Sequence, residues 1–105
     1  MRVISEPEFS DRLRGLLEPM AGKVGSVSGP GRSGCIASAY ASHILGVPFL
    51  PSPRIASKKL YPILVVDTAT ETGATLRKYM RKCGTPLGIA VFHEPPRVKF
   101  WYEVK

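Results

Sequence analysis

The sequence predicts a single α/β domain, with a minimal parallel sheet and helices on both of its faces. Two continuous apolar runs, YPILVV at residues 61–66 and PLGIAVF at residues 86–92, are typical of strands buried on both sides in a parallel sheet. Helical patterns precede and separate these runs, and this alternation predicts right-handed crossovers. A chain of 105 residues, 44% of them apolar, is long enough for one core.

The first half of the chain predicts a helix followed by a strand, a turn and a second helix. In residues 1–22, Ser5 and Glu8 have the spacing of a capping box, and apolar side chains then recur with helical period. Residues 24–28 form a short strand that leads into the glycine-rich turn SGPGRSG at residues 28–34. From Ser33 a helix of small and apolar residues runs to Leu45.

The second half predicts three further strands around one helix, so that residues 24–92 form the parallel core. A short strand lies near residues 47–50, an exposed basic loop follows at 51–59, and the buried strand 61–66 ends at Asp67. After a polar turn at 68–73, a helix with a cationic outer face continues to Gly84. Beyond the strand 86–92, alternating apolar residues predict a terminal strand at 98–104.

The charge of the chain is positive and unevenly distributed. Fifteen basic residues exceed eight acidic ones by seven, and no Asp or Glu occurs between Pro19 and Val66. Such a field favours polyanions: nucleic acid, phosphorylated metabolites and an acidic membrane are all admissible. Cys35 and Cys83 lie in apolar patterns without metal-ligand spacing, which predicts buried free thiols in a reducing compartment. With neither a leader peptide nor a membrane span apparent, we expect a cytoplasmic protein.

The most specific motif is ILVVDTATETGATL at residues 63–76. Parallel sheets bind ligands beyond the carboxyl ends of their strands, which is where the acid and threonines of this motif fall. Backbone N–H groups of the turn and the hydroxyls of Thr70, Thr72 and Thr75 suit a phosphate monoester, while Gly73 permits a close approach of the backbone. Asp67 would then lie near a sugar hydroxyl.

This motif resembles that of the type I phosphoribosyltransferase family, in which an apolar strand, two acids and a T-G-x-T turn bind phosphoribosyl pyrophosphate. The resemblance covers residues 24–76 and, more loosely, 86–104, and it implies a phosphoribosyltransferase-like, Rossmann-like domain. It implies that Asp67 engages the ribose hydroxyls and that Glu71 handles the proton of the base. The 5′-phosphate loop implied by the resemblance consists of Thr68, Ala69, Thr70, Thr72, Gly73, Ala74 and Thr75. Thr68 departs from the family pattern, because the second acid normally stands there.

Two other segments are similar to the same family. Arg32, Ser33 and Gly34 correspond to the loop that takes the pyrophosphate, although a glycine-rich segment of this kind also serves as a simple strand-to-helix turn. After the last parallel strand, the resemblance implies an aromatic residue that stacks on the base. Phe92 and Trp101 are the candidates, and filling the core is the alternative interpretation for both.

The resemblance implies transfer of a 5-phosphoribosyl group from phosphoribosyl pyrophosphate to a nitrogen of a purine-type base, with release of pyrophosphate and with magnesium bound through the substrate and Asp67. The alternative is a catalytically reduced module that binds a nucleotide or phosphoribosyl pyrophosphate without turnover. An RNA-binding derivative ranks last, because the cations at residues 77–82 are more simply a solvated helix face unless other basic surface adjoins them. We expect a homodimer, and neither a membrane nor nucleic acid as partner.

Overall fold

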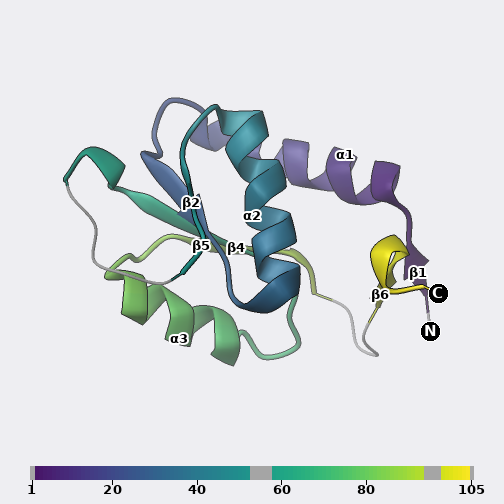
Figure 1. Ribbon diagram of the computed structural model, residues 1–105. Helices are drawn as coiled ribbons and strands as arrows, with labels where there is room; N and C mark the ends of the chain where they lie inside the picture. Colours follow the sequence, from purple (N-terminus) through teal and green to yellow (C-terminus); the bar gives the residue numbers. More distant parts are fainter. Residues whose placement is uncertain (1, 53–57, 94–97, 105) are drawn as a thin grey trace.

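The central element of the structure, a computed structural model that describes residues 2–52, 58–93 and 98–104, is a four-stranded parallel sheet (Figure 1). Its order is β3 (Phe49–Leu50), β2 (Ser26–Ser28), β4 (Ile63–Ala69) and β5 (Gly88–Phe92). The side chains of Ile63 through Val66 are completely buried. Residues 63–66 of the predicted strand therefore lie at the centre of the sheet and are buried on both sides, whereas Tyr61 and Pro62 precede β4 and are not buried.

Helices cover both faces of this sheet, as predicted. On one face, α1 (Glu6–Leu17) and α2 (Gly31–Leu45) pack with Leu64 and Val66. On the other face, α3 (Ala74–Cys83) packs with Ile63 and Val65. Alternate residues of β4 thus enter two separate cores. Within the described ranges, every helix is too short or too polar to span a lipid bilayer.

A second, two-stranded sheet joins the beginning of the chain to its end. β1 (Val3–Ile4) pairs in parallel with β6 (Lys99–Phe100), and a 3-10 helix at Trp101–Glu103 follows directly. The predicted terminal strand at 98–104 is therefore much shorter. A side-chain cap ends it, because Glu103 Oε1 accepts the backbone N–H of Phe100 at 3.0 Å and closes a turn. Figure 1 shows this small sheet beside one end of α1, apart from the labelled strands β2, β4 and β5 of the central sheet.

Two element boundaries also differ from the sequence-based expectation. The N–H of Gly34 donates to the carbonyl of Pro30 at 2.9 Å, so α2 begins at Gly31 and its first turn contains Ser33. β4 continues beyond Asp67, because Asp67 pairs with Ala90 and Ala69 with Phe92 of β5. Asp67 therefore sits in a strand, two residues before its end.

The turn between β2 and α2 packs backbone against backbone. A Cβ atom at Gly29 would overlap the carbonyl oxygens of Gly34 and Val66, and one at Gly34 would overlap the ring of Pro30. Glycine at position 29 thus allows the start of α2 to lie directly against the end of β4. This contact brings the N-terminus of α2 to the same edge of the sheet as Asp67.

Candidate functional site

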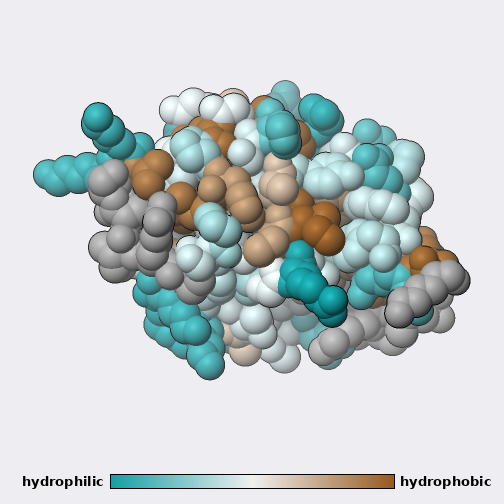
Figure 2. All heavy atoms as spheres, viewed as in Figure 1, coloured by the Kyte–Doolittle hydropathy of each residue, from teal (hydrophilic) through white to brown (hydrophobic). Residues whose placement is uncertain are grey.

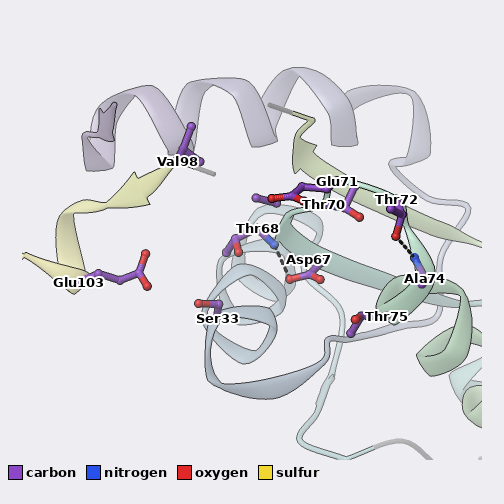
Figure 3. Close-up of a pocket in the computed structure, with 11 residues that line it drawn as sticks. Ser33, Asp67, Thr68, Thr70, Glu71, Thr72, Ala74, Thr75, Val98 and Glu103 are labelled. Atoms are coloured by element: carbon purple, nitrogen blue, oxygen red, sulfur yellow. Dashed lines mark hydrogen bonds between the residues drawn. The ribbon is translucent and has the colours of Figure 1, made fainter. Parts of the chain in front are cut away.

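A pocket of about 360 Å³ opens at the carboxyl end of β4, where parallel sheets bind their ligands. Its walls come from the end of β4, the following loop, the first turns of α2 and α3, and the segment around β6. The lining residues are Ser33, Asp67, Thr68, Ala69, Thr70, Glu71, Thr72, Ala74, Thr75, Val98 and Glu103. Figure 3 shows the labelled side chains around the cavity, with Val98 and Glu103 on the side opposite the loop before α3. Most of the residues singled out in the motif at 63–76 therefore share one cavity.

Threonine side chains shape the loop at residues 70–73. Thr70 Oγ1 accepts the N–H of Gly73 at 2.6 Å, and Thr72 Oγ1 accepts the N–H of Ala74 at 3.3 Å. Gly73 has a left-handed backbone with φ of 80°, which turns the chain into α3. Ala74 and Thr75 at the N-terminus of α3 consequently face the pocket. The positive end of the helix dipole and its outward N–H groups favour an anion there.

The carboxylate of Asp67 lies near the centre of the site, between Ser33 and Thr75 in the view of Figure 3. Its Oδ1 accepts the backbone N–H of Thr68 at 2.8 Å. Burial raises the pKa of Asp67 above its ordinary value, and the hydrogen bonds with Thr68 offset part of that rise. A half-buried carboxylate beside hydroxyls and helix N-termini is suited to bind sugar hydroxyls or a hard cation.

Thr68, which stands where the family pattern has a second acid, is buried and contacts a residue outside the motif at 63–76. Tyr102 Oη donates to Ser33 Oγ at 2.9 Å and also shares a hydrogen bond with the Thr68 side chain. Burial is the main reason that the pKa of Tyr102 is raised, and the nearby carboxylates of Glu103 and Asp67 raise it further, while its hydrogen bonds lower it. The phenol thus links the start of α2 to β4 beside the pocket.

Val98 and Glu103 complete the pocket wall, although the sequence predicts no functional role for either. Both belong to the segment around β6, which the pattern of alternating apolar residues presents as an ordinary strand. The pairing of β6 with β1, the packing of Phe100 against Phe9 and Phe92, and the hydrogen bond from Tyr102 to Ser33 place this segment beside the central sheet. No local motif marks Val98, Glu103 or Tyr102. An exposed acidic residue such as Glu103 is not by itself enough to predict a binding site from the sequence.

The predicted pyrophosphate residues separate in the structure. Ser33 lines the pocket, but Gly34 is buried in α2. Arg32 lies instead in a neighbouring pocket of about 490 Å³, which shares Ser33 and Glu103 with the first. The two pockets therefore meet where Ser33, at the start of α2, and Glu103, in the segment after β6, line both of them. We call residues 98–104 the tail.

The predicted stacking residues do not line the pocket. Phe92 has no exposed surface, and the guanidinium of Arg12 covers its ring at 4.5 Å from the centroid, so no base reaches it. Trp101 is only partly buried, but its ring packs against Phe9 and Tyr40 in an aromatic cluster. The core-filling interpretation therefore holds for Phe92, and Trp101 faces the α1 side. Cys35, predicted to be buried, is only half-buried, whereas Cys83 is fully buried; both are free thiols.

Comparison with known proteins supports the fold. No family model matches the sequence, and no curated protein matches it. The structure is similar to the xanthine-guanine-hypoxanthine phosphoribosyltransferase of Helicobacter pylori, with a TM-score of 0.76, 15% identity, and coverage of 98% of this chain and 93% of that chain. It is also similar to a purine phosphoribosyltransferase of Pyrococcus horikoshii, with a TM-score of 0.69, 17% identity, and coverage of 100% and 96%.

The chain has a phosphoribosyltransferase-like fold. The similarity extends over nearly the whole length of both neighbours, so it includes the small sheet formed by β1 and β6 as well as the central one. In the phosphoribosyltransferase-like fold of this chain, the pocket lies at the edge that the motif at residues 63–76 predicts.

Proposed function

We propose that the protein is a phosphoribosyltransferase that transfers the 5-phosphoribosyl group of phosphoribosyl pyrophosphate to a nitrogen of a purine-type base and releases pyrophosphate. The observation that carries the proposal is the pocket at the end of β4, in which a threonine-rich loop, a helix N-terminus and a half-buried carboxylate face one cavity. The structural neighbours, both purine phosphoribosyltransferases by name, are consistent with this activity.

The residues around the loop would bind the 5′-phosphate. Thr70 and Thr72 hold the loop through their own hydrogen bonds, so their main role is to keep the backbone N–H groups in place. Thr75 Oγ1 lines the pocket at the first turn of α3, where a hydroxyl donates to an anion that the helix dipole also favours. Neutral donors of this kind bind phosphate without a lysine or arginine in the loop.

Asp67 would bind the ribose hydroxyls, and it suits magnesium as well. Magnesium prefers oxygen ligands and is usually held by one or two carboxylates together with substrate phosphates. We therefore infer an ion held mainly through the substrate, with Asp67 as its ligand from the protein. When bound, the ion would offset the negative charge of the leaving pyrophosphate. Asp67 orients the ribose so that its C1 carbon lies in line between the base and the leaving group.

The base would enter beside Glu71, which lines the exposed rim of the pocket. As the base nitrogen forms its bond to C1 and the bond from C1 to pyrophosphate breaks, the base loses a proton, which the Glu71 carboxylate would accept. Charge on the departing pyrophosphate would be stabilised by the N-terminus of α2, where Ser33 faces the cavity. Positioning and electrostatics thus account for most of the catalysis.

A second function, binding without turnover, is favoured by one observation. Position 68 holds a buried hydroxyl that is engaged by Tyr102 in place of a second carboxylate. Loss of that negative charge removes a ligand for the sugar or the cation but leaves the phosphate loop intact. A regulatory module that senses phosphoribosyl pyrophosphate or a mononucleotide would have these features.

Calorimetric titration with phosphoribosyl pyrophosphate, with and without magnesium, tests both functions. We expect Thr75→Ala to weaken binding by about tenfold, because a hydrogen bond to a charged group contributes about 1.5–3 kcal/mol. Thr75→Ser keeps the hydroxyl and should bind like the original protein. Asp67→Asn should remove the dependence on magnesium.

Release of pyrophosphate on addition of guanine, hypoxanthine, xanthine or adenine then separates the two functions. Turnover with any base establishes the transferase, whereas binding without turnover establishes the module. If Thr75→Ala binds as tightly as Thr75→Ser, the phosphate is not in this loop and both proposals fail.

A further inference from the structure

The outer face of α3 carries only cations among its long side chains. Arg77, Lys78, Arg81 and Lys82 are all exposed, whereas Leu76, Tyr79 and Cys83 are buried against the sheet. We call these four cations, together with Lys58 and Lys59, the basic face. A group of hydrophilic side chains lies at the lower left of Figure 2, at the position of α3 in Figure 1.

No carboxylate of the described residues forms an ion pair with Lys78, Arg81 or Lys82. Arg77 and Arg81 are four residues apart, as are Lys78 and Lys82, and like charges at this spacing destabilise a helix. A helix face that served only for solubility would gain from alternating signs of charge. The arrangement is therefore better explained by an anionic partner that offsets the repulsion.

The packing of the chain extends this charge beyond the helix. Tyr61 Oη donates to the carbonyl of Cys83, the last residue of α3, at 2.8 Å, and Leu60 packs in the same apolar cluster. The short 3-10 helix Lys58–Leu60, with two exposed lysines, therefore adjoins the C-terminal end of α3. Other basic surface thus adjoins the cations of α3, which the sequence alone does not reveal.

Acidic side chains of the described residues lie elsewhere. Glu6, Glu8 and Asp11 belong to α1, on the opposite face of the sheet, and Glu18 follows directly after it. Asp67, Glu71 and Glu103 line the pocket. Within the described residues, the side of α3 is therefore positive and the side of α1 is of mixed charge, an arrangement that orients the protein toward an extended anion.

We propose that the basic face binds the phosphate backbone of a nucleic acid duplex. None of the exposed residues of α3 is aromatic, so the face lacks the rings on which single-stranded bases stack. It also lacks the large apolar side chains with which a helix enters a membrane: the exposed large apolar residues, Val3, Leu16 and Val104, lie outside α3. Charges without rings or apolar anchors suit phosphates that are read without regard to base sequence.

Fluorescence anisotropy with labelled 20-base-pair duplexes of mixed sequence, one of RNA and one of DNA, tests this proposal. At about 50 mM salt we expect binding in the micromolar range, and a slope of log K against log salt of about −3, since each neutralised phosphate contributes about −0.9. The double variant Lys78→Glu, Lys82→Glu should bind at least about tenfold more weakly, with a salt slope smaller in magnitude by about two. A preference for RNA or for DNA identifies the source of the backbone.

The matched control is Arg14→Glu, Lys23→Glu, which changes the net charge equally at exposed positions outside the basic face. This control should bind within about twofold of the original protein, as expected for charges that contact no phosphate. An equal loss in both double variants shows that net charge alone is responsible and overturns the proposal. It is also overturned if the protein binds vesicles containing phosphatidylserine but no duplex, or a single strand as tightly as a duplex.

The proposal does not depend on the transferase function. None of the substituted residues lines the pocket, so the titration with phosphoribosyl pyrophosphate should give the same result for both double variants. The same titration also verifies that the variants are folded. If Lys78→Glu, Lys82→Glu loses duplex binding but still binds phosphoribosyl pyrophosphate, the loss is therefore caused by the change in the basic face and not by unfolding or by damage to the pocket.

Discussion

Asp67 lies both in β4 and in the wall of the pocket, and these two environments affect the charge of its carboxylate in opposite ways. The backbone of Asp67 pairs with Ala90 in the interior of the sheet, where burial disfavours a negative charge. A ligand that is rich in hydroxyls, or that carries a cation, favours that same charge. The raised pKa of Asp67 is therefore a cost in stability, and the proposed function gives a reason for it.

This conflict predicts how stability depends on pH. Because the folded state raises the pKa of Asp67, its contribution is most favourable below the unfolded pKa of about 3.9 and is lost as the pH rises through the folded pKa. Asp67→Asn should therefore unfold at a higher temperature than the original protein at pH 7. The difference should shrink as the pH approaches 4. Thermal unfolding at several pH values measures both effects, and an Asn variant that is less stable at pH 7 would contradict the assignment.

At this scale, the sequence predicts residues that lie within one continuous motif and misses those that depend on distant packing. Asp67 and the threonines fall into the pocket because the end of β4 and the start of α3 are adjacent in the chain. Phe92 is likewise the last residue of a strand, but the guanidinium of Arg12 from α1 lies over its ring. No local sequence pattern predicts this contact between distant residues. Tyr102 and Glu103 reach the site through contacts between distant chain segments, such as the pairing of β1 with β6 and the hydrogen bond from Tyr102 to Ser33.

At the scale of elements, the helices and the strands of the central sheet follow the sequence closely and differ mainly at their ends, whereas β1 and the short 3-10 helices are not predicted. Periodicity determines which residues face the core, so α1, α3 and the buried strands appear where their patterns lie. Their ends depend on single hydrogen bonds, such as that from Gly34 to Pro30, which starts α2 two residues before Ser33. The consequence for the site is direct, because Ser33 becomes part of a helix N-terminus instead of a free loop.

Two glycines should respond in opposite ways to the same substitution. Gly29→Ala should destabilise the protein by about 1–3 kcal/mol or more, because the added methyl group would overlap backbone atoms of Gly34 and Val66. Gly15→Ala, within α1 and with open space around it, should instead stabilise by about 0.5–1 kcal/mol. Denaturation in urea measures both changes. A neutral effect at Gly29 would show that α2 and β4 separate easily.

At the scale of the whole molecule, the pocket forms between the central sheet and the small sheet of β1 and β6. Val98 and Glu103 come from the small sheet's side, and the other lining residues come from β4, α2, the loop before α3 and the first turn of α3. The hydrogen bond from Tyr102 to Ser33 crosses this boundary. The relative placement of two sheets results from many apolar contacts of α1, and it is the part of the fold that the sequence does not predict.

Tyr102→Phe tests whether this boundary matters for binding. Loss of one hydroxyl should lower the free energy of unfolding by about 0.5–1.5 kcal/mol and weaken binding of phosphoribosyl pyrophosphate severalfold, because the tail is held less firmly over the pocket. Tyr40→Phe is the matched control, since it removes a hydroxyl that donates to Glu6 away from the pocket. Calorimetry and thermal unfolding should show similar stability in both variants but weaker binding only in Tyr102→Phe. Equal affinity in the two would assign the tail a structural role alone.

The pairing of β1 with β6 also has a consequence for the order in which the protein folds. Val3 pairs with Lys99 and Ile4 with Phe100, so this contact closes a loop that contains almost all of the chain between them. The strands of the central sheet are joined by much shorter loops. Because the entropy cost of closing a loop rises with its length, we expect the small sheet to form after the central one. Until it forms, the pocket lacks the walls that Val98 and Glu103 supply.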